Sequence, residues 1–176
     1  MNTYKIDEYE FTEIINAATI TNRIIEIADQ INEDYKTKKP LFVITLTGGM
    51  FFGVELLKHI KLDCQCQVIS TKSYGNSMQS SGNVNINMFD IKAHNEDIII
   101  VEDIVDTGLT MTKLVEKIEA LHPASMKIAT LINKPDCNAY KVNLDYVGFN
   151  LGDGFLLGYG LDYKGYGRNL NGIYSL

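Results

Sequence analysis

The strongest constraint on the fold is a run of β-branched residues followed at once by acids, glycine and threonine. Residues 98–101 read Ile-Ile-Ile-Val, which is typical of a strand buried on both faces of a parallel sheet. Glu102, Asp103 and Asp106 follow, and residues 107–110 read Thr-Gly-Leu-Thr. Apolar residues then recur at helical spacing: Met111, Leu114, Val115, Ile118 and Leu121. The stretch therefore predicts a buried strand, a polar turn and a helix.

The polar turn has the chemistry of a site for a phosphate carried on a sugar. The first N–H groups of a helix lack partners within the helix, and the helix dipole favours negative charge beside them. Gly108 allows close approach of the backbone, and the hydroxyls of Thr107 and Thr110 add donors. Carboxylates repel phosphate, so Glu102 and Asp103 have to face ribose hydroxyls or a metal ion. The alternative is that these two acids only cap the helix.

The order of residues in this stretch resembles the phosphoribosyl pyrophosphate (PRPP) motif of the type I phosphoribosyltransferases. Residues 101–108, Val-Glu-Asp-Ile-Val-Asp-Thr-Gly, are similar to the form found in the hypoxanthine-guanine branch. The resemblance implies an α/β fold: a central parallel sheet flanked by helices, a flexible loop, and a small hood from the C-terminal and N-terminal segments. It also implies that PRPP is bound by the residues of the motif: Glu102, Asp103, Ile104, Val105, Asp106, Thr107, Gly108, Leu109 and Thr110.

Length, composition and charge limit the class of protein. A chain of 176 residues with 45% hydrophobic and 22% charged residues suits one domain over residues 1–176, with a hood mainly from about residues 135–176. A net charge of −6 argues against a nucleic-acid surface. No apolar run approaches the ~20 residues of a membrane span, so we expect no membrane partner and a cytoplasmic location. Cys64, Cys66 and Cys137 lack metal-site spacing and are interpreted as reduced thiols.

An earlier part of the chain predicts a strand and helix that end in a second ligand loop. An amphipathic helix is expected from about residue 17 to 36 with Asn16 as its cap, and a buried strand over residues 41–46. Thr47-Gly48-Gly49 follows this strand, before a helix that runs to Ile60. In the family this loop binds pyrophosphate and usually reads Leu-Lys-Gly, which implies that Thr47 and Gly48 bind pyrophosphate through backbone N–H groups. A simple tight turn is the alternative.

Residues 72–83 form a polar stretch rich in serine, glycine and asparagine. They lie between predicted strands over residues 66–73 and 84–90, and they lack apolar periodicity, so a mobile loop is expected. Ser73 and Tyr74 resemble the start of the flexible catalytic loop of the family, which closes over the reacting centre. An inert hairpin connection is the alternative.

Lys134 follows a further predicted strand over residues 126–132. A lysine in this place is often a solvated surface residue. At the crevice beside the central strand, however, it can donate to an exocyclic oxygen of a planar base. In the family the matching lysine recognises the 6-oxo group of a purine.

Residues 148–172 hold 8 of the 14 glycines of the chain and several tyrosines. A Gly/Tyr-rich meander that only covers the sheet is one interpretation. The segment also resembles the purine hood of the family, which implies that Phe155 stacks on the base and that the backbone of Leu156 reads its C2 edge. Asp162 would hold Mg²⁺ together with Glu102 and Asp103, and Arg168 would reach pyrophosphate.

The resemblance implies transfer of 5-phosphoribose from PRPP to N9 of hypoxanthine or guanine, with Mg²⁺ as cofactor and Asp106 as acceptor of the N7 proton. A homodimer or homotetramer is also implied. Adenine would place an amino donor against Lys134, whereas xanthine stays open. Two other classes remain: a PRPP-sensing RNA-binding regulator, for which the longest basic run is only Lys38-Lys39, and a receiver-like Mg²⁺ domain.

Overall fold

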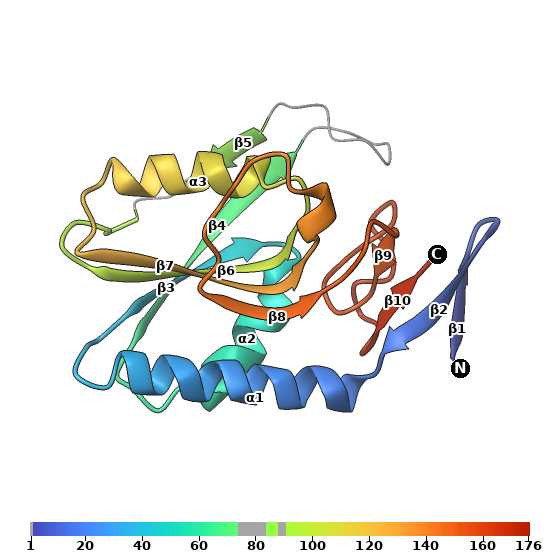
Figure 1. Ribbon diagram of the computed structural model, residues 1–176, viewed down its shortest axis with the longest axis horizontal. Coiled ribbons are helices and arrows are strands. Elements are labelled where there is room, and N and C mark those ends of the chain that lie inside the picture. The colour runs from blue at the N-terminus through green and yellow to red at the C-terminus, as the bar shows by residue number, and fades with distance from the viewer. Residues whose placement is uncertain (1, 74–83, 88–90) are drawn as a thin grey trace.

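A six-stranded sheet forms the centre of the molecule. The computed structural model describes residues 2–73, 84–87 and 91–176. The strand order is β5-β4-β3-β6-β7-β8, in which β5 is antiparallel to β4 and the other neighbours are parallel (Figure 1). The strands span β3 Leu41–Leu46, β4 Gln65–Ser73, β5 Val84–Asn87, β6 Asp97–Val105, β7 Ser125–Asn133 and β8 Tyr146–Asn150. The predicted parallel sheet is confirmed.

Helices cover both faces of this sheet. Helices α1 (Ala17–Asp34) and α2 (Gly49–His59) lie on one face, and α3 (Leu109–Glu119) lies on the other (Figure 1). The apolar face of each helix packs against strand residues, so the sheet separates two hydrophobic cores. Residues 98–101 of β6 are fully buried between these cores, as four consecutive β-branched residues predict.

A second, smaller sheet forms the hood beyond the carboxyl ends of the central strands. It joins β1 (Thr3–Ile6) and β2 (Tyr9–Ile15) to β9 (Leu156–Leu157) and β10 (Ile173–Ser175), in the order β1-β2-β10-β9 (Figure 1). Its buried core consists of Phe11, Leu157 and Tyr174. The hood is therefore built from both ends of the sequence, as the resemblance implies.

One expectation about the central motif is wrong. Strand β6 continues to Val105, so Glu102 and Asp103 lie inside the strand and not in the turn. Continued pairing with β7 extends the strand, since Glu102 lies opposite Thr130 and Val105 opposite Asn133. The alternative that the two acids cap α3 is excluded by their distance along the chain from its first residue.

Other predicted elements agree closely with the structure. Helix α1 begins after Asn16, whose side-chain oxygen accepts the N–H of Thr19 at 2.9 Å, which confirms the predicted cap. A short 3₁₀ helix, η1 (Pro135–Cys137), follows β7. Residues 74–83 of the predicted loop lie outside the described residues, as do residues 88–90 of the predicted strand.

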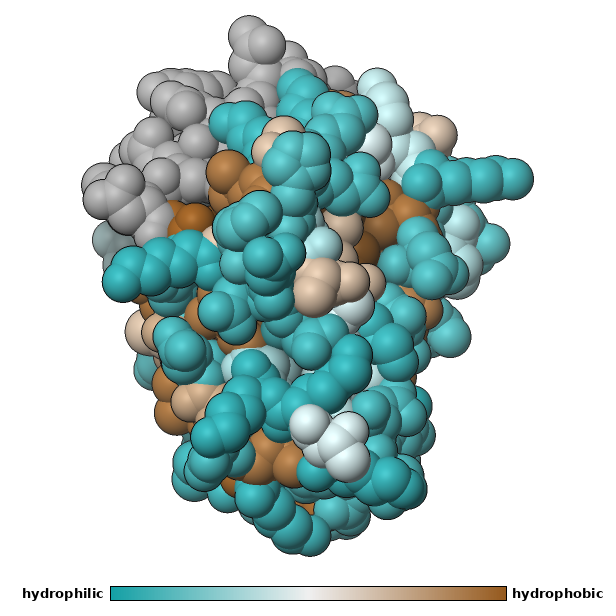
Figure 2. All heavy atoms as spheres, turned by 90° about the vertical axis from the view of Figure 1, so that its left-hand side faces the viewer, coloured by the Kyte–Doolittle hydropathy of each residue, from teal (hydrophilic) through white to brown (hydrophobic). Residues whose placement is uncertain are grey.

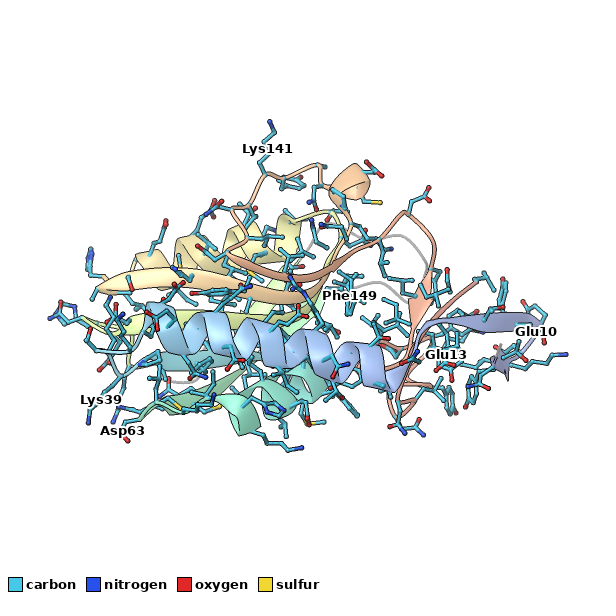
Figure 3. All side chains as sticks on the ribbon, turned by 60° about the horizontal axis from the view of Figure 1, so that its bottom comes forward. Glu10, Glu13, Lys39, Asp63, Lys141 and Phe149 are labelled. Carbon is cyan, nitrogen blue, oxygen red and sulfur yellow. The ribbon has the colours of Figure 1, made fainter. Side chains whose placement is uncertain are left out.

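The end of the molecule opposite the hood is covered mostly by hydrophilic side chains (Figure 2). Lys39 and Asp63 form an exposed ion pair at this end, with Lys39 Nζ 3.0 Å from Asp63 Oδ2 (Figure 3). Phe149 of β8 packs against the core beneath α1 (Figure 3). No helix in the described part of the chain has the length and apolarity needed to cross a membrane.

Candidate active site

The candidate site lies where the carboxyl ends of β3, β6 and β7 face the hood. Two glycines bring these parts together. A Cβ atom on Gly48, in the loop after β3, would lie 1.7 Å from Asp103 Oδ2 of β6. A Cβ atom on Gly160, in the hood segment, would lie 2.2 Å from Gly48 O. The absence of both side chains therefore allows the hood segment, the β3–α2 loop and the acids of β6 to pack in direct contact.

Glu102 is a buried acid held by its neighbours in the sheet. The Thr45 hydroxyl of β3 donates to Glu102 Oε1 at 2.7 Å, and the Asp103 N–H donates to the same oxygen at 3.1 Å. Burial raises the pKa of the Glu102 carboxyl well above its usual range, and the Asp103 charge raises this pKa further. Two carboxyl groups with little solvent are thus side by side, an arrangement that a bound cation stabilises.

The loop after β6 contains a left-handed glycine directly before α3. Gly108 adopts φ +82° as the residue before α3 and has no side chain with which to cap this helix. The first hydrogen bond of α3 runs from Thr112 N to Gly108 O at 2.9 Å, so the N–H groups of the preceding turn have no partner within the helix. The Leu109 N–H donates to the Thr107 hydroxyl oxygen at 3.4 Å. An anion fits at this helix terminus.

The backbone of Tyr140 packs against the loop after β6. Its N–H donates to Thr107 O at 3.0 Å, and a Cβ atom on Gly108 would lie 2.2 Å from Tyr140 O. Sequence reasoning missed this role, because Tyr140 lies far along the chain from this loop. Gly108 indicated a close backbone approach but not which residue makes it.

The loop after β3 contains the second candidate phosphate site. The peptide bond between Leu46 and Thr47 is cis. Gly48 precedes α2 without a capping side chain, and the Met50 N–H donates to Thr47 O at 3.3 Å. The first turn of α2 therefore also directs backbone N–H groups out of the helix.

Lys134 and Asp106 meet across the ends of β7 and β6. The Lys134 ammonium lies 3.7 Å from Asp106 Oδ2, with side-chain exposures of 7% and 52%. The Lys134 N–H donates to Val105 O at 3.0 Å, which holds the two strand ends in register. Burial argues against the alternative that Lys134 is a solvated surface residue.

Phe155 lies in an aromatic group of the hood. Its ring centre is 5.7 Å from that of Tyr163 in an edge-on arrangement and 6.2 Å from that of Phe11. Leu156 is buried beside it, and the Phe155 carbonyl accepts the Leu176 N–H at 3.1 Å. Residues of β2 and of the C-terminal segment thus fix this ring together.

Asp162 and Arg168 pair with each other in the hood. Asp162 Oδ1 contacts Arg168 Nη2, and Asp162 Oδ2 accepts the Gly165 N–H at 2.7 Å. Arg168 Nη1 also donates to Gly160 O at 2.5 Å. Among the described residues, no three His, Cys, Asp or Glu side chains gather as metal ligands, so Asp162 does not complete a site with Glu102 and Asp103.

The remaining candidates can be placed only in part. Ser73 is the final residue of β4, and Tyr74 lies outside the described residues. Thr110 lies in the first turn of α3, and Ile104 and Val105 lie within β6.

Comparisons with known proteins identify the family of this chain. The family model described as "Phosphoribosyl transferase domain" matches residues 11–164. The hypoxanthine-guanine phosphoribosyltransferase of Bacillus subtilis (strain 168) is 37% identical over 158 residues, covering 89% of this chain and 88% of that protein. The hypoxanthine-guanine-xanthine phosphoribosyltransferase of Tritrichomonas foetus is 38% identical over 160 residues, covering 89% and 86%.

A solved structure gives the same result. The crystal structure of a hypoxanthine-guanine phosphoribosyltransferase from Bacillus anthracis superposes with a TM-score of 0.87 at 32% identity, covering 94% of this chain and 98% of that one. Sequence and fold agree, and the chain belongs to the hypoxanthine-guanine branch of the phosphoribosyl transferase family.

Proposed function

We propose that this protein transfers 5-phosphoribose from PRPP to N9 of hypoxanthine or guanine, releasing the nucleoside monophosphate and pyrophosphate. The observation that carries the proposal is the pair of Lys134 and Asp106, 3.7 Å apart beside the PRPP motif. Lys134 presents donors and Asp106 presents an acceptor. The adjacent 6-oxo oxygen and N7 proton of a 6-oxopurine need this combination of partners.

The two helix termini are the proposed sites for the phosphate groups of PRPP. Backbone N–H groups after Gly108, with Thr107 and Thr110, would bind the 5-phosphate. Those of Thr47 and Gly48 would bind pyrophosphate. Arg168 would exchange its contact with Asp162 for the pyrophosphate, to which its planar guanidinium is suited.

The acids of β6 are proposed to bind the ribose hydroxyls and a divalent cation. Mg²⁺ is usually held by one or two protein carboxylates together with substrate phosphates, so the paired carboxyl groups of Glu102 and Asp103 fit it without a third protein ligand. Asp162 would add a ligand once Arg168 has moved. When bound, Mg²⁺ would supply positive charge to the departing pyrophosphate.

The base itself would be held by Phe155, Leu156 and Lys134, with Asp106 as the acceptor of the N7 proton while N9 forms its bond to ribose. Phe155 provides an aromatic face, and its two aromatic neighbours limit its motion. The loop that begins at Ser73 and Tyr74 is proposed to exclude water from the reacting centre.

Xanthine is the second candidate base. The Tritrichomonas foetus relative is named for xanthine as well as for hypoxanthine and guanine. Xanthine carries the same 6-oxo group, so the Lys134–Asp106 pair would not exclude it. We further propose a cytoplasmic enzyme that forms a homodimer or homotetramer.

The test is nucleotide formation by the purified protein with Mg²⁺ and PRPP, with hypoxanthine, guanine, xanthine and adenine in separate reactions. We expect product from hypoxanthine or guanine and none from adenine, whose amino group would face the Lys134 ammonium. Omission of Mg²⁺ should abolish turnover. Absence of product with all four bases would reject the proposal, and a salt-dependent shift of RNA by the same protein would then support the regulator.

A further inference from the structure

Three asparagine side chains form a chain of hydrogen bonds next to Lys134, which we name the amide ladder: Asn133, Asn138 and Asn150. Asn133 Nδ2 donates to Asn150 Oδ1 at 2.8 Å. Asn138 Nδ2 donates to Asn133 Oδ1 at 3.0 Å. Both polar atoms of Asn133 are therefore used, and Asn133 is the central member of the ladder.

The amide ladder joins three elements at the edge of the active site. Asn133 is the last residue of β7, Asn150 is the last residue of β8, and Asn138 directly follows η1. The backbone repeats these connections, because Leu151 N donates to Asn133 O at 2.9 Å. On its other side Asn133 lies opposite Val105, the residue before Asp106. The ladder thus lies at the strand ends that Asp106 and Lys134 directly follow.

Lys134 lies in the bend between the parts that the ladder connects. Its N–H is bonded to Val105 O, and its carbonyl accepts the Cys137 N–H at 3.0 Å, within η1. The hydrogen bond from Asn138 to Asn133 joins the two ends of this bend, so η1 cannot move away from β7 without breaking it. A lysine stem has several rotatable bonds, and a fixed backbone root limits where its ammonium can lie.

The unpaired half of Asn138 supports a role beyond stability. Asn138 Oδ1 is buried and has no hydrogen-bond partner among the described residues. A buried acceptor without a partner costs free energy, and an apolar side chain of the same size would avoid that cost. An apolar side chain, however, could not make the hydrogen bond that Asn138 donates to Asn133.

We propose that the amide ladder positions Lys134 for recognition of the base, with Asn133 as the central positioning residue. The inference rests on the proposed function, because it requires Lys134 to meet the 6-oxo group. Breaking the ladder should leave the PRPP motif intact, so binding of the base should weaken more than binding of PRPP.

The first experiment compares Asn133→Leu with the wild type. Loss of the two hydrogen bonds should raise KM for hypoxanthine or guanine roughly threefold to tenfold, the size expected for one or two hydrogen bonds, with KM for PRPP changed less than about twofold. Asn32→Leu is the matched control. Asn32 also makes two hydrogen bonds, to His59 O at 3.0 Å and from Lys61 N at 2.8 Å, and it lies in the last turns of α1, away from the hood. The Asn32→Leu variant should lower thermal stability without raising KM for the base more than KM for PRPP.

A double-mutant cycle tests whether Asn133 acts through Lys134. In a Lys134→Met background, Asn133→Leu should cause no further rise in the KM for the base. Asn150 provides an independent pair of variants if Lys134→Met fails to fold. Asn150→Leu removes the acceptor for Asn133 and should raise the KM for the base, whereas Asn150→Asp retains an acceptor and should not.

Additive effects in the cycle, or equal rises in both KM values for Asn133→Leu, would overturn the positioning role. The failure of this inference is distinct from the failure of the proposed function. A wild-type protein that makes no nucleotide rejects the function, and the inference with it. An active wild type whose Asn133 and Asn150 variants show no preferential loss for the base rejects only the amide ladder.

Discussion

Lys134 Nζ and Asp106 Oδ2 lie 3.7 Å apart, yet the side chain of Lys134 is 7% exposed and that of Asp106 is 52% exposed. A buried ammonium is costly without an opposite charge, and Asp106 provides that charge while remaining open to a ligand. The pair thus offers an oriented donor and an accessible acceptor at one point. The predictions on the base depend on this asymmetry.

Asp106→Asn should lower turnover by roughly 10²-fold or more, the usual scale of general-base catalysis. The amide keeps the shape of the side chain but cannot take the N7 proton. The KM for PRPP should stay near the wild-type value, since the backbone donors of the loop remain. Steady-state kinetics with each substrate varied in turn provides the measurement, and unchanged turnover would exclude the proton-acceptor role.

Lys134→Ala should weaken binding of the base much more than binding of PRPP. The variant removes the donor to the 6-oxo group, and a charge-assisted hydrogen bond contributes about 1.5–3 kcal/mol, or roughly tenfold to a hundredfold in KM for the base. Lys141→Ala is the control, since Lys141 is exposed and extends away from the molecule (Figure 3). Equal losses for both substrates would mean that Lys134 does not contact the base.

Gly108→Ala should raise the KM for PRPP and lower stability. Its φ of +82° disfavours a side chain by about 1–2 kcal/mol, and the new methyl group would collide with Tyr140 O, 2.2 Å from the Cβ position. Gly165→Ala separates the two causes, because Gly165 has φ +86° but nothing within 4 Å of its Cβ position. Urea unfolding should show a smaller loss for Gly165→Ala, and its KM for PRPP should be unchanged. Equal kinetic effects in both variants would contradict this account.

Stability should decrease in acid partly through Asp34. The Lys127 ammonium and the Tyr146 hydroxyl donate to its carboxylate at 2.8 and 2.6 Å, and they hold the pKa of Asp34 below its usual range. Because the folded-state pKa is the lower one, this stabilisation is present above the ordinary aspartate pKa of about 3.9 and is lost as the pH falls through the folded-state value.

Asp34→Asn tests this contribution. It should lower the free energy of unfolding at pH 7 by less than about 1 kcal/mol, because solvent screens a side chain that is 43% exposed. The difference from wild type should shrink below about pH 3.9. Asp63→Asn, in an exposed pair with Lys39, should change stability little at either pH. A deficit for Asp34→Asn that persists unchanged in acid would rule out the charge as its cause.

The elements that could be predicted from sequence are those with long, regular patterns. Helix α1 repeats its apolar residues over several turns, and β3 and β6 are continuous apolar runs, so local information is sufficient for them. The end of β6 was misjudged because its pairing with β7 continues past Val101. That pairing is a tertiary effect, which no pattern within residues 102–105 reveals.

The hairpin of β1 and β2 was not predicted as strands, although Tyr9 and Phe11 alternate with polar residues. β1 and β2 pair with each other across a two-residue turn, but β2 also pairs with β10 from the other end of the sequence, and that pairing leaves no local signal. In the candidate site, sequence reasoning named Glu102, Asp103, Asp106 and Lys134, which the structure places at the carboxyl ends of β6 and β7. Sequence reasoning missed Thr45, Tyr140 and the amide ladder. These residues form hydrogen bonds to other residues of the protein, and threonine, tyrosine and asparagine are common in any fold.

The order of the hood sheet determines when this part of the protein can form during synthesis. Strand β10 lies between β2 and β9, so backbone pairing joins the N-terminal hairpin to the segment that holds Phe155 through residues 173–175. On the ribosome, the central sheet can assemble while Phe11 still lacks its partner Tyr174. The nascent chain should therefore form the central sheet, with residues 102–110 and Lys134, before the hood, and should expose the apolar face of the hairpin until translation has passed β10.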